Sequence, residues 1–445
     1  MKRGIFKNKK VLIMGLGLHG GGVGTAKFFC EQGADVLVTD LKTEEQLKDS
    51  LQKLSKLKIK YTLGRHEEAD FLWADLIIKN PDVPQTSPYL EIARKNEIEI
   101  ETDISLFFKL SQAFIIGITG TKGKSTVASL IYHILNEEFN NVFLAGNIGI
   151  SVLDLLPKVK KGNKVVLELS SFELEGLDQS PQIAVITNIM PDHLNRYATM
   201  AEYIDAKKII FRHQEKTDAL VLNEDDLIVR QFGKESKSKV CYYSINNSPR
   251  DIDLSGFKLL GKNNLSNLLG AIRVAEIINV PAENIETAIK SFKGVHSRQE
   301  LVGEVSGVKY INDTTATIPE AVISAIDSLS EKYPGENMFI ICGGVYKGVD
   351  YKKMAEKVKE KNIGLIMLPG SASDKIRESL PGYTKIYDVS SMQEAVKKAS
   401  EMAQRKDLVI LSPAASSFNM FKNEFDRGAQ FVKAVMALKQ NEKAS

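Results

Sequence analysis

The segment 120–126 has the residue types and spacing to bind a nucleotide phosphate. It reads Gly-Thr-Lys-Gly-Lys-Ser-Thr, follows an apolar run (Phe114–Thr119) and precedes a helical pattern that extends to Leu135. A strand, a glycine-rich turn and a helix start occur in this order in phosphate-binding loops, where backbone N–H groups converge on phosphate oxygens. Lys124 would add a positive charge, and the hydroxyl of Ser125 could hold Mg²⁺.

This loop is a compact variant of the strict pattern, which has glycine where the chain has Ile118. The alternative interpretation is an ordinary glycine-rich turn between a strand and a helix. The glycines, the lysine and the hydroxyl, taken together in this context, favour the phosphate-binding loop.

A second glycine-rich turn lies near the N-terminus. The predicted strand 10–14 leads into Gly-Leu-Gly-Leu-His-Gly at 15–20, followed by a helix to about Gln32 and a strand that ends at Asp40. This order is typical of dinucleotide-binding turns, in which the acid could bond a ribose or a base. Tight packing of a helix on a strand, without a ligand, is the alternative.

Two polar side chains lie at or after the ends of predicted strands in the central region. Glu168 lies in the strand 164–169, and His193 follows the strand 183–186. Parallel sheets place their sites at these carboxyl ends, so Ser125, Glu168 and His193 would form a metal–triphosphate cluster. Taken singly, Glu168 could cap a helix or face solvent, and His193 could be structural.

Lys207 lies in a predicted helix over Met200–Arg212, on the same face as Tyr203 and Ile210. Considered alone, this helix indicates a lysine whose stem is buried and whose charged tip reaches solvent.

Composition excludes several classes of protein. The chain has 445 residues, 43% of them hydrophobic and 26% charged, and a net charge of +3 with dispersed basic residues, which does not indicate nucleic-acid binding. Cys30, Cys241 and Cys342 fit no metal-ligand spacing. The apolar run 11–14 is too short for a signal peptide, and no run is long enough to cross a membrane. We therefore expect a cytoplasmic protein without membrane or nucleic-acid partners.

The alternation of strands and helices predicts an α/β protein of three domains, at 1–100, 101–296 and 297–445. The third domain has predicted strands at 308–312, 337–342, 363–368 and 407–411. Such alternation indicates mostly parallel sheets that are covered on both faces.

The order of motifs along the whole chain resembles the Mur ligases. These motifs lie at 120–126, 146–149, 168–172, 188–193, 203–207, 264–267, 298, 312–313 and 411–414. Within the family, 15–20, 412–421, Lys422-Asn423 and Arg427-Gly428 are most similar to the branch that adds D-glutamate. The Asp-Asn-Pro-Arg signature of the branch that adds diaminopimelate or lysine does not occur in the sequence.

The resemblance implies a fold and an activity. The N-terminal domain would be Rossmann-like and bind UDP, the central one a parallel-sheet ATPase-like domain with the phosphate loop, and the C-terminal one Rossmann-like. The enzyme would use ATP and Mg²⁺ to add D-glutamate to UDP-N-acetylmuramoyl-L-alanine through an acyl phosphate. It would act as a monomer in cytoplasmic peptidoglycan precursor synthesis.

The resemblance also implies roles for individual residues. Catalysis would involve Lys124, Glu168, His193 and Lys207. ATP would bind Gly120, Thr121, Lys122, Gly123, Lys124, Ser125, Thr126, Asn267, Arg298 and Asp313. The UDP substrate would bind Gly17, Leu18, His19, Gly20, Asp40 and Asn147. The amino acid would bind Lys347, Ser417 and Phe421. The metal would bind Ser125, Glu168, His193 and a carbamylated Lys207, whose anion would attract a cation that an ammonium repels.

Three positions depart from the pattern of this branch. Ser297 stands at a usual histidine, Thr315 at a usual lysine, and Tyr346 at a usual aspartate. Because they flank the expected phosphate and amino-acid sites, a related ligase that adds a different amino acid, such as L-glutamate, stays open. Lys347 and Ser417 could also be a loop residue and a helix cap.

Two other classes of function compete with the ligase. A nicotinamide-dependent oxidoreductase would explain the N-terminal glycines but leaves the central phosphate loop without a role. A nucleotide-binding switch or scaffold would bind ATP without releasing phosphate in response to an amino acid. A folylpolyglutamate synthase is a near neighbour, but that branch lacks an N-terminal domain of this kind.

Overall fold

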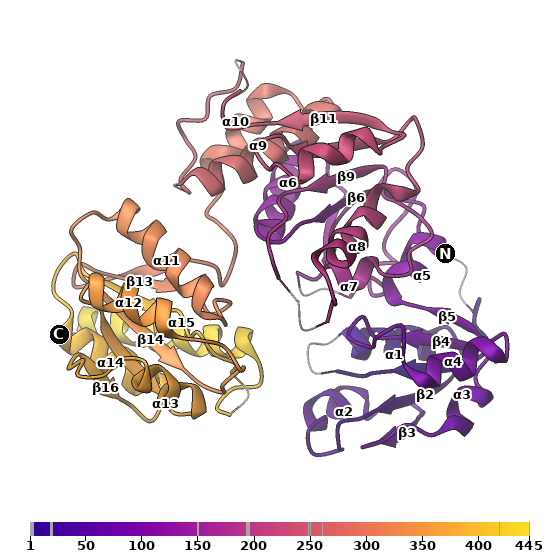
Figure 1. Cartoon of the computed structure of the whole chain (residues 1–445), viewed down its shortest axis with the longest axis horizontal. Coiled ribbons are helices and arrows are strands. Elements are labelled where there is room, and N and C mark those ends of the chain that lie inside the picture. Colours follow the sequence, from indigo (N-terminus) through magenta and orange to yellow (C-terminus); the bar gives the residue numbers. More distant parts are fainter. Residues whose placement is uncertain are drawn as a thin grey trace. The chain divides into compact units, whose positions relative to one another are not determined.

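A computed structural model of the chain describes residues 4–17, 21–148, 151–192, 196–247, 249, 251–259, 261–417 and 419–444. The chain divides into two compact units, one of residues 1–257 with 262–292 and the other of residues 258–261 with 293–445. The larger unit contains two sheets and the smaller unit contains one (Figure 1).

The first sheet of the larger unit has five parallel strands in the order β3-β2-β1-β4-β5. Its strands are β1 (Lys10–Met14), β2 (Asp35–Asp40), β3 (Ile59–Leu63), β4 (Leu76–Lys79) and β5 (Glu99–Glu101). Its helices are α1 (Gly21–Glu31), α2 (Lys48–Leu54), α3 (Glu68–Trp73) and α4 (Pro88–Lys95). The strand order reverses between β1 and β4, so the glycine-rich turn after β1 lies where such sheets bind ligands.

The second sheet has six parallel strands in the order β11-β10-β9-β6-β8-β7. They are β6 (Phe114–Thr119), β7 (Val142–Gly146), β8 (Lys164–Glu168), β9 (Ile183–Ile186), β10 (Ala219–Asn223) and β11 (Lys239–Tyr243). The helices are α5 (Asp103–Leu110), α6 (Lys124–Glu138), α7 (Ser171–Leu174), α8 (Met200–Arg212), α9 (Lys262–Ile277) and α10 (Ala282–Ser291), with a 3₁₀ helix at Val229–Lys234. β6 lies between β8 and β9, so the loop after β6 is flanked by the ends of both neighbours.

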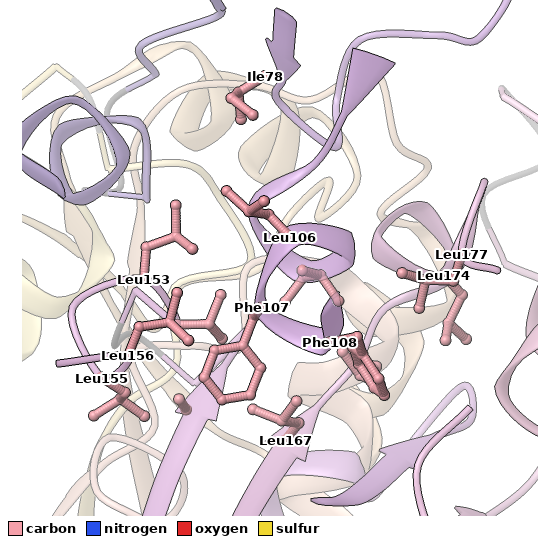
Figure 2. Close-up of a cluster of buried hydrophobic side chains, with 14 of the residues drawn as sticks. Ile78, Leu106, Phe107, Phe108, Leu153, Leu155, Leu156, Leu167, Leu174 and Leu177 are labelled. Atoms are coloured by element: carbon pink, nitrogen blue, oxygen red, sulfur yellow. The ribbon is translucent and has the colours of Figure 1, made fainter. Parts of the chain in front are cut away.

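One continuous hydrophobic core joins these two sheets. Helix α5, which starts with a reciprocal hydrogen-bonded cap between Thr102 and Ser105, lies between them (Figure 2). The core residues that Figure 2 labels are Ile78, Leu106, Phe107, Phe108, Leu153, Leu155, Leu156, Leu167, Leu174 and Leu177. All are at least nine-tenths buried, and each such side chain contributes about 1.5–3 kcal/mol on leaving water. The two sheets of the larger unit therefore share their main source of stability.

Arg196 adds a polar link between the same two sheets. Its guanidinium donates to the backbone oxygens of Pro81 (3.0 Å) and Asp82 (2.9 Å), which follow β4. It also donates to the Glu175 carboxylate (3.1 Å) and lies 4.1 Å from the centre of the Phe172 ring. One side chain thus ties the turn after β4 to the segment after β8.

The sheet of the smaller unit is mixed, in the order β12-β13-β17-β14-β15-β16. Its strands are β12 (Glu300–Val305), β13 (Val308–Asn312), β14 (Met338–Gly343), β15 (Gly364–Leu368), β16 (Ile386–Asp388) and β17 (Leu408–Leu411). Its helices are α11 (Pro319–Lys332), α12 (Lys352–Glu360), α13 (Ser371–Glu378), α14 (Met392–Met402) and α15 (Glu424–Ala444). Only β12 is antiparallel, and separate apolar cores cover the two faces.

The predicted α/β class and the strands that flank the phosphate loop are confirmed. The sequence did not predict β7, β10, β11, β12 or β16, which lie at or near sheet edges. Within the described ranges, every helix is too short or too polar to span a lipid bilayer. The predicted domain limits at residues 100 and 296 stay predictions.

Glu173 in the first turn of α7 provides a test of stability against pH. Its carboxylate accepts from the backbone N–H and hydroxyl of Ser170 (both 2.7 Å), and these bonds lower its pKa. Burial and, to a smaller extent, the charges of Asp103 and Glu168 outweigh them and raise the pKa to about 8. The folded state then holds this proton more tightly than the unfolded state, so the free energy of unfolding falls as pH rises from the ordinary value of 4.5 to about 8. We expect Glu173→Gln to be more stable than the wild type at pH 8, by about 1 kcal/mol or more, and to lose this advantage near pH 4.5.

Thermal unfolding at several pH values measures this difference. The matched control is Glu394→Gln, because the exposed Glu394 makes the same pair of bonds to Ser390, and these lower its pKa. Its contribution to stability is present above the ordinary pKa and is lost as pH falls, so the control has no advantage at pH 8. Equal pH profiles for Glu173→Gln and the wild type would contradict the buried, proton-binding state of Glu173.

Candidate functional site

The loop between β6 and α6 is held by the end of β9. Gly120 has φ +143°, and a Cβ at this position would lie 1.9 Å from Thr187 Oγ1. The Thr187 hydroxyl donates to the backbone oxygen of Lys122 (2.7 Å), which also accepts from Asn188 Nδ2 (3.0 Å). Asn188 Oδ1 in turn accepts from the backbone N–H of Lys122 (2.8 Å). The neighbouring strand therefore fixes the loop in one conformation.

The first turn of α6 has the features of an anion site. Gly123, at its N-cap, has φ +83° and provides no side-chain cap for the N–H groups that follow. Lys124 Nζ donates back to the loop oxygens of Gly120 (3.0 Å) and Thr121 (3.1 Å), so its charge lies over the loop. The backbone N–H groups of a helix N-terminus, the positive end of the helix dipole and an ammonium group together favour phosphate.

Asn267, predicted to lie near adenine, contacts this loop from α9. The side chain is 8% exposed, and a Cβ on Gly123 would lie 2.3 Å from its Oδ1. Ser125 is buried in the first turn of α6, whereas Lys122 is exposed. The larger unit thus places Asn267 beside the predicted triphosphate loop.

Glu168 presents a buried oxygen that has no hydrogen-bond partner among the described residues. It ends β8 and is 2% exposed, and its Oε1 has one long contact with Asn147 Nδ2 (3.5 Å), while Oε2 has none. The backbone N–H of Asn147 also donates to the Glu168 carbonyl (3.0 Å). A buried carboxylate oxygen without a donor is costly unless a cation binds it, so this position fits a metal ligand. Among the described residues, no cluster of three or more His, Cys, Asp or Glu surrounds Glu168 or lies elsewhere.

Lys207 reaches the same loop from α8, whose N-terminus is capped by Thr199. Its side chain is 1% exposed, and Nζ donates to the Gly120 oxygen (2.9 Å) and lies 4.7 Å from the centre of the Tyr203 ring. Burial and, to a smaller extent, the charge of Lys124 lower its pKa to about 7, against the opposite effect of Asp192. The alternative of a lysine tip in solvent is therefore wrong. A partly neutral amine of this kind is the form that adds CO₂.

Asp40 stabilises the N-terminal glycine-rich turn. Its Oδ2 accepts from the backbone N–H groups of Leu16 (2.8 Å) and Gly17 (3.1 Å), and its Oδ1 accepts from Lys42 N–H (2.9 Å). Both oxygens thus already have backbone donors, and contact with a ribose or base stays a prediction. The predicted residues Leu18, His19, Gly20 and His193 lie outside the described residues.

In the smaller unit, the predicted site residues Asp313, Lys347 and Ser417 lie after the ends of three strands, β13, β14 and β17. Asp313 follows β13 and accepts from Ser412 Oγ (3.0 Å), which follows β17. Burial raises the pKa of Asp313 to about 7, although Ser412 and the Gln299 N–H bond lower it. Arg298, predicted to bind ATP with Asp313, is exposed.

The predicted amino-acid residues Lys347 and Ser417 lie on adjacent segments. Val345, after β14, pairs with Ser416 through two backbone hydrogen bonds (2.9 and 3.1 Å). Lys347 is exposed, and its Nζ is 3.4 Å from Thr317 Oγ1, whereas Ser417 is buried. Phe421 is 8% exposed and packs in the core beside α14 and α15, which leaves little of its ring for a ligand.

Thr187 is a functional candidate that the motifs did not identify, and Asn188, the first residue of the motif 188–193, had no assigned role. They follow β9 directly, so the strand-end rule that identified Glu168 also applies to them. Tyr203 belongs with them, because its hydroxyl lies 3.1 Å from Thr121 Oγ1.

Family models match three parts of the chain. Residues 9–102 match the Mur ligase MurD-like N-terminal domain, residues 118–275 the Mur ligase middle domain, and residues 297–415 the Mur ligase glutamate ligase domain. These matches cover the phosphate loop, Glu168 and Lys207 in the middle model and Lys347 in the last.

Relatives match nearly the full length. UDP-N-acetylmuramoylalanine–D-glutamate ligase of Roseiflexus sp. (strain RS-1) is 38% identical over 96% of this chain and 98% of its own. The ligase of the same name from Borreliella afzelii (strain PKo) is 37% identical over 96% and 98%.

Solved structures share the fold at lower identity. UDP-N-acetylmuramate–alanine ligase MurC of Thermotoga maritima has a TM-score of 0.64 at 20% identity, covering 97% of this chain and all of that one. MurF ligase of Thermotoga maritima, in complex with ADP, has a TM-score of 0.58 at 15% identity, covering 98% and 96%. With its phosphate loop, buried carboxylate and near-full-length relatives, this chain belongs to the Mur ligase family.

Proposed function

We propose that this protein is an ATP-dependent ligase that adds D-glutamate to UDP-N-acetylmuramoyl-L-alanine, in the cytoplasmic synthesis of peptidoglycan precursors. The observation that carries the proposal is the meeting of two lysines at one carbonyl of the phosphate loop. Lys124 from α6 and Lys207 from α8 both donate to the Gly120 oxygen, at 3.0 and 2.9 Å. The near-full-length relatives that bear this activity in their names support the choice of substrates.

The reaction must first make the alanyl carboxylate reactive. One of its oxygens attacks the γ-phosphorus of ATP, the bond to the bridging oxygen breaks, and ADP leaves. The resulting acyl phosphate provides a leaving group that a free carboxylate lacks. The glutamate amine then attacks the acyl carbon, the tetrahedral intermediate expels inorganic phosphate, and the amine loses a proton as the amide forms.

The residues of the loop stabilise the charge that develops on the transferred phosphoryl group. Lys124 and the N–H groups at the start of α6 are already oriented, so little reorganisation is needed in the transition state. Asn147, which contacts Glu168, would hold the alanyl carboxylate near this group. The UDP part would lie at the turn that Asp40 stabilises, and the incoming glutamate at Lys347 and Ser417.

Ser125, Glu168, His193 and the carbamate of Lys207 would hold Mg²⁺, which neutralises charge on the phosphates when bound. The unpaired oxygen of Glu168 and the lowered pKa of Lys207 fit this assignment. Asn267, Arg298 and Asp313 would complete the nucleotide site. We propose the domain limits 1–100, 101–296 and 297–445 and a monomeric enzyme.

The choice of amino acid is tested directly with purified enzyme, ATP, Mg²⁺ and UDP-N-acetylmuramoyl-L-alanine. D-glutamate, L-glutamate, L-lysine or no amino acid is added, and phosphate release and product mass are measured. We expect product with D-glutamate alone. Product with L-glutamate instead would favour the related ligase left open by Thr315 and Tyr346. Phosphate release that does not depend on an amino acid would contradict the ligase.

Lys124→Ala tests the phosphate loop. Removing this charge should lower kcat by about 10²-fold or more, with circular dichroism and thermal unfolding near those of the wild type. The control is Lys161→Ala, an exposed lysine before β8 that should leave kcat unchanged. Near-normal turnover of Lys124→Ala would remove this residue from the site.

Lys207→Ala tests the carbamate. We expect an inactive enzyme that small carboxylic acids such as acetate partly reactivate, because they replace the missing anion in the space left by the side chain. Lys208→Ala is the matched control on the same helix, since Lys208 pairs with Glu235 (2.8 Å) away from the loop. Its activity should stay near that of the wild type. A failure of rescue in a folded Lys207→Ala enzyme would argue against the carbamate.

A further inference from the structure

Among the described residues, Arg427 has the largest fully buried side chain, and none of the proposed functions uses it. It lies in the first turn of α15 and is 0% exposed. Its Nε donates to Thr314 Oγ1 (3.0 Å), Nη2 to the Thr314 carbonyl (2.9 Å) and Nη1 to the Ala415 carbonyl (3.1 Å).

The guanidinium is buried without a bonded counter-ion. All three acceptors given above are neutral oxygens, and in the part of the chain that the structure describes no carboxylate forms an ion pair with Arg427. Burial lowers its pKa to about 10, partly offset by Glu424, so the group stays charged at neutral pH. A buried charge without an ion pair is costly, and the first turn of a helix also disfavours a cation. Both costs indicate that the charge serves a ligand.

The position of Arg427 connects it to the predicted amino-acid site. Ala415, which accepts from Nη1, lies two residues before Ser417, and the intervening Ser416 pairs with Val345 on the segment that carries Lys347. On the other side, Thr314 follows Asp313 at the end of β13. The guanidinium therefore fixes the backbone from which the side chains of this site project.

Three charged side chains near the predicted amino-acid site influence one another. Loss of water lowers the pKa of the Lys347 ammonium, and Arg427 lowers it further while Glu424 raises it, which shows that these three groups interact. Lys347 and Arg427 thus both interact with the acidic side chain of Glu424. A ligand that brings a second carboxylate would balance them.

We propose that Arg427 is a positioning residue that gives the amino-acid site its preference for a substrate with an acidic side chain. It holds the segments that carry Lys347 and Ser417 and adds a buried positive charge behind them, without touching the substrate. This inference rests on the proposed ligase activity, which it deepens by assigning the source of selectivity.

The test compares Arg427→Met, which keeps an unbranched apolar stem but no charge, with Arg427→Lys, which keeps the charge but loses the planar fork. For each, KM is measured for D-glutamate, ATP and the UDP substrate, and kcat/KM for D-glutamate is compared with that for D-glutamine. We expect Arg427→Met to raise the KM for D-glutamate about tenfold or more and to reduce the preference for D-glutamate over D-glutamine by a similar factor. Arg427→Lys should retain more of that preference, and the KM for the UDP substrate should not change in either.

Lys309→Met is the matched control. Lys309 lies near the start of β13, the strand that precedes Thr314, and it pairs with Glu336 (3.7 Å) and lies over the Tyr333 ring. Lys309→Met loses the same charge in the same unit, and the preference of this variant for D-glutamate over D-glutamine should equal that of the wild type.

A second pair of variants applies if Arg427→Met does not fold. Thr314→Val removes the acceptor of Nε and keeps the arginine, while Thr314→Ser keeps the hydroxyl. Thr314→Val should raise the KM for D-glutamate and Thr314→Ser should not.

An unchanged preference in Arg427→Met, or an equal loss with D-glutamate and D-glutamine, would overturn the inference and leave Arg427 a structural residue. Failure of the proposed function is distinguishable, because the wild type would then form no product with D-glutamate at all.

Discussion

The close approach of the backbone at Gly120 to Thr187 is the contact on which the site depends. Any side chain at position 120 would overlap the Thr187 hydroxyl, since even a Cβ would lie 1.9 Å away. Because Thr187 also holds the Lys122 carbonyl, the end of β9 sets the path of the loop after β6. This path sets the positions of the first turn of α6, of Lys124 and of the Gly120 carbonyl to which Lys207 donates. The proposed nucleotide site is therefore a property of two adjacent strands and not of the loop alone.

Burial gives the side chains around this loop their chemistry. Lys207 loses water and lies near Lys124, so its amine is partly neutral, whereas Glu168 keeps a buried oxygen without a donor among the residues that the structure describes. In the smaller unit, Asp313 holds its proton more tightly than an exposed aspartic acid, and Arg427 is charged without a bonded counter-ion in the described part of the chain. Each of these groups is costly in the free protein. Nucleotide, metal and acidic substrate would compensate these costs, which couples the binding of ligands to the stability of the site.

Much of the fold was predictable because its strands are apolar runs that end at turn residues. The phosphate loop and Glu168 stand directly at such ends, so local sequence was sufficient to place them. The burial of Lys207 could not be predicted from its helix alone, because a lysine on an amphipathic helix is typical of the surface until the loop that covers it is known. Only the family resemblance assigned it to the site. The role of Asp40 depends in the same way on backbone N–H groups more than twenty residues away. The edge strand β12 was missed because a pattern of alternating strands and helices gives no sign of an antiparallel neighbour. Phe421, which its motif assigned to the amino-acid site, packs with its ring in the core, and its contact with a ligand stays a prediction.

The hydrophobic core shared by the two sheets of the larger unit decides how this protein can be divided for study. A polypeptide that stopped at residue 102 would retain all of β1 to β5 but lose α5, whose Leu106 and Phe107 face the interior (Figure 2). Such a fragment would expose an apolar face of the sheet to water and would tend to self-associate. Isotope labelling, fragment screening or display of the N-terminal sheet should therefore retain α5 and the segment that packs on it.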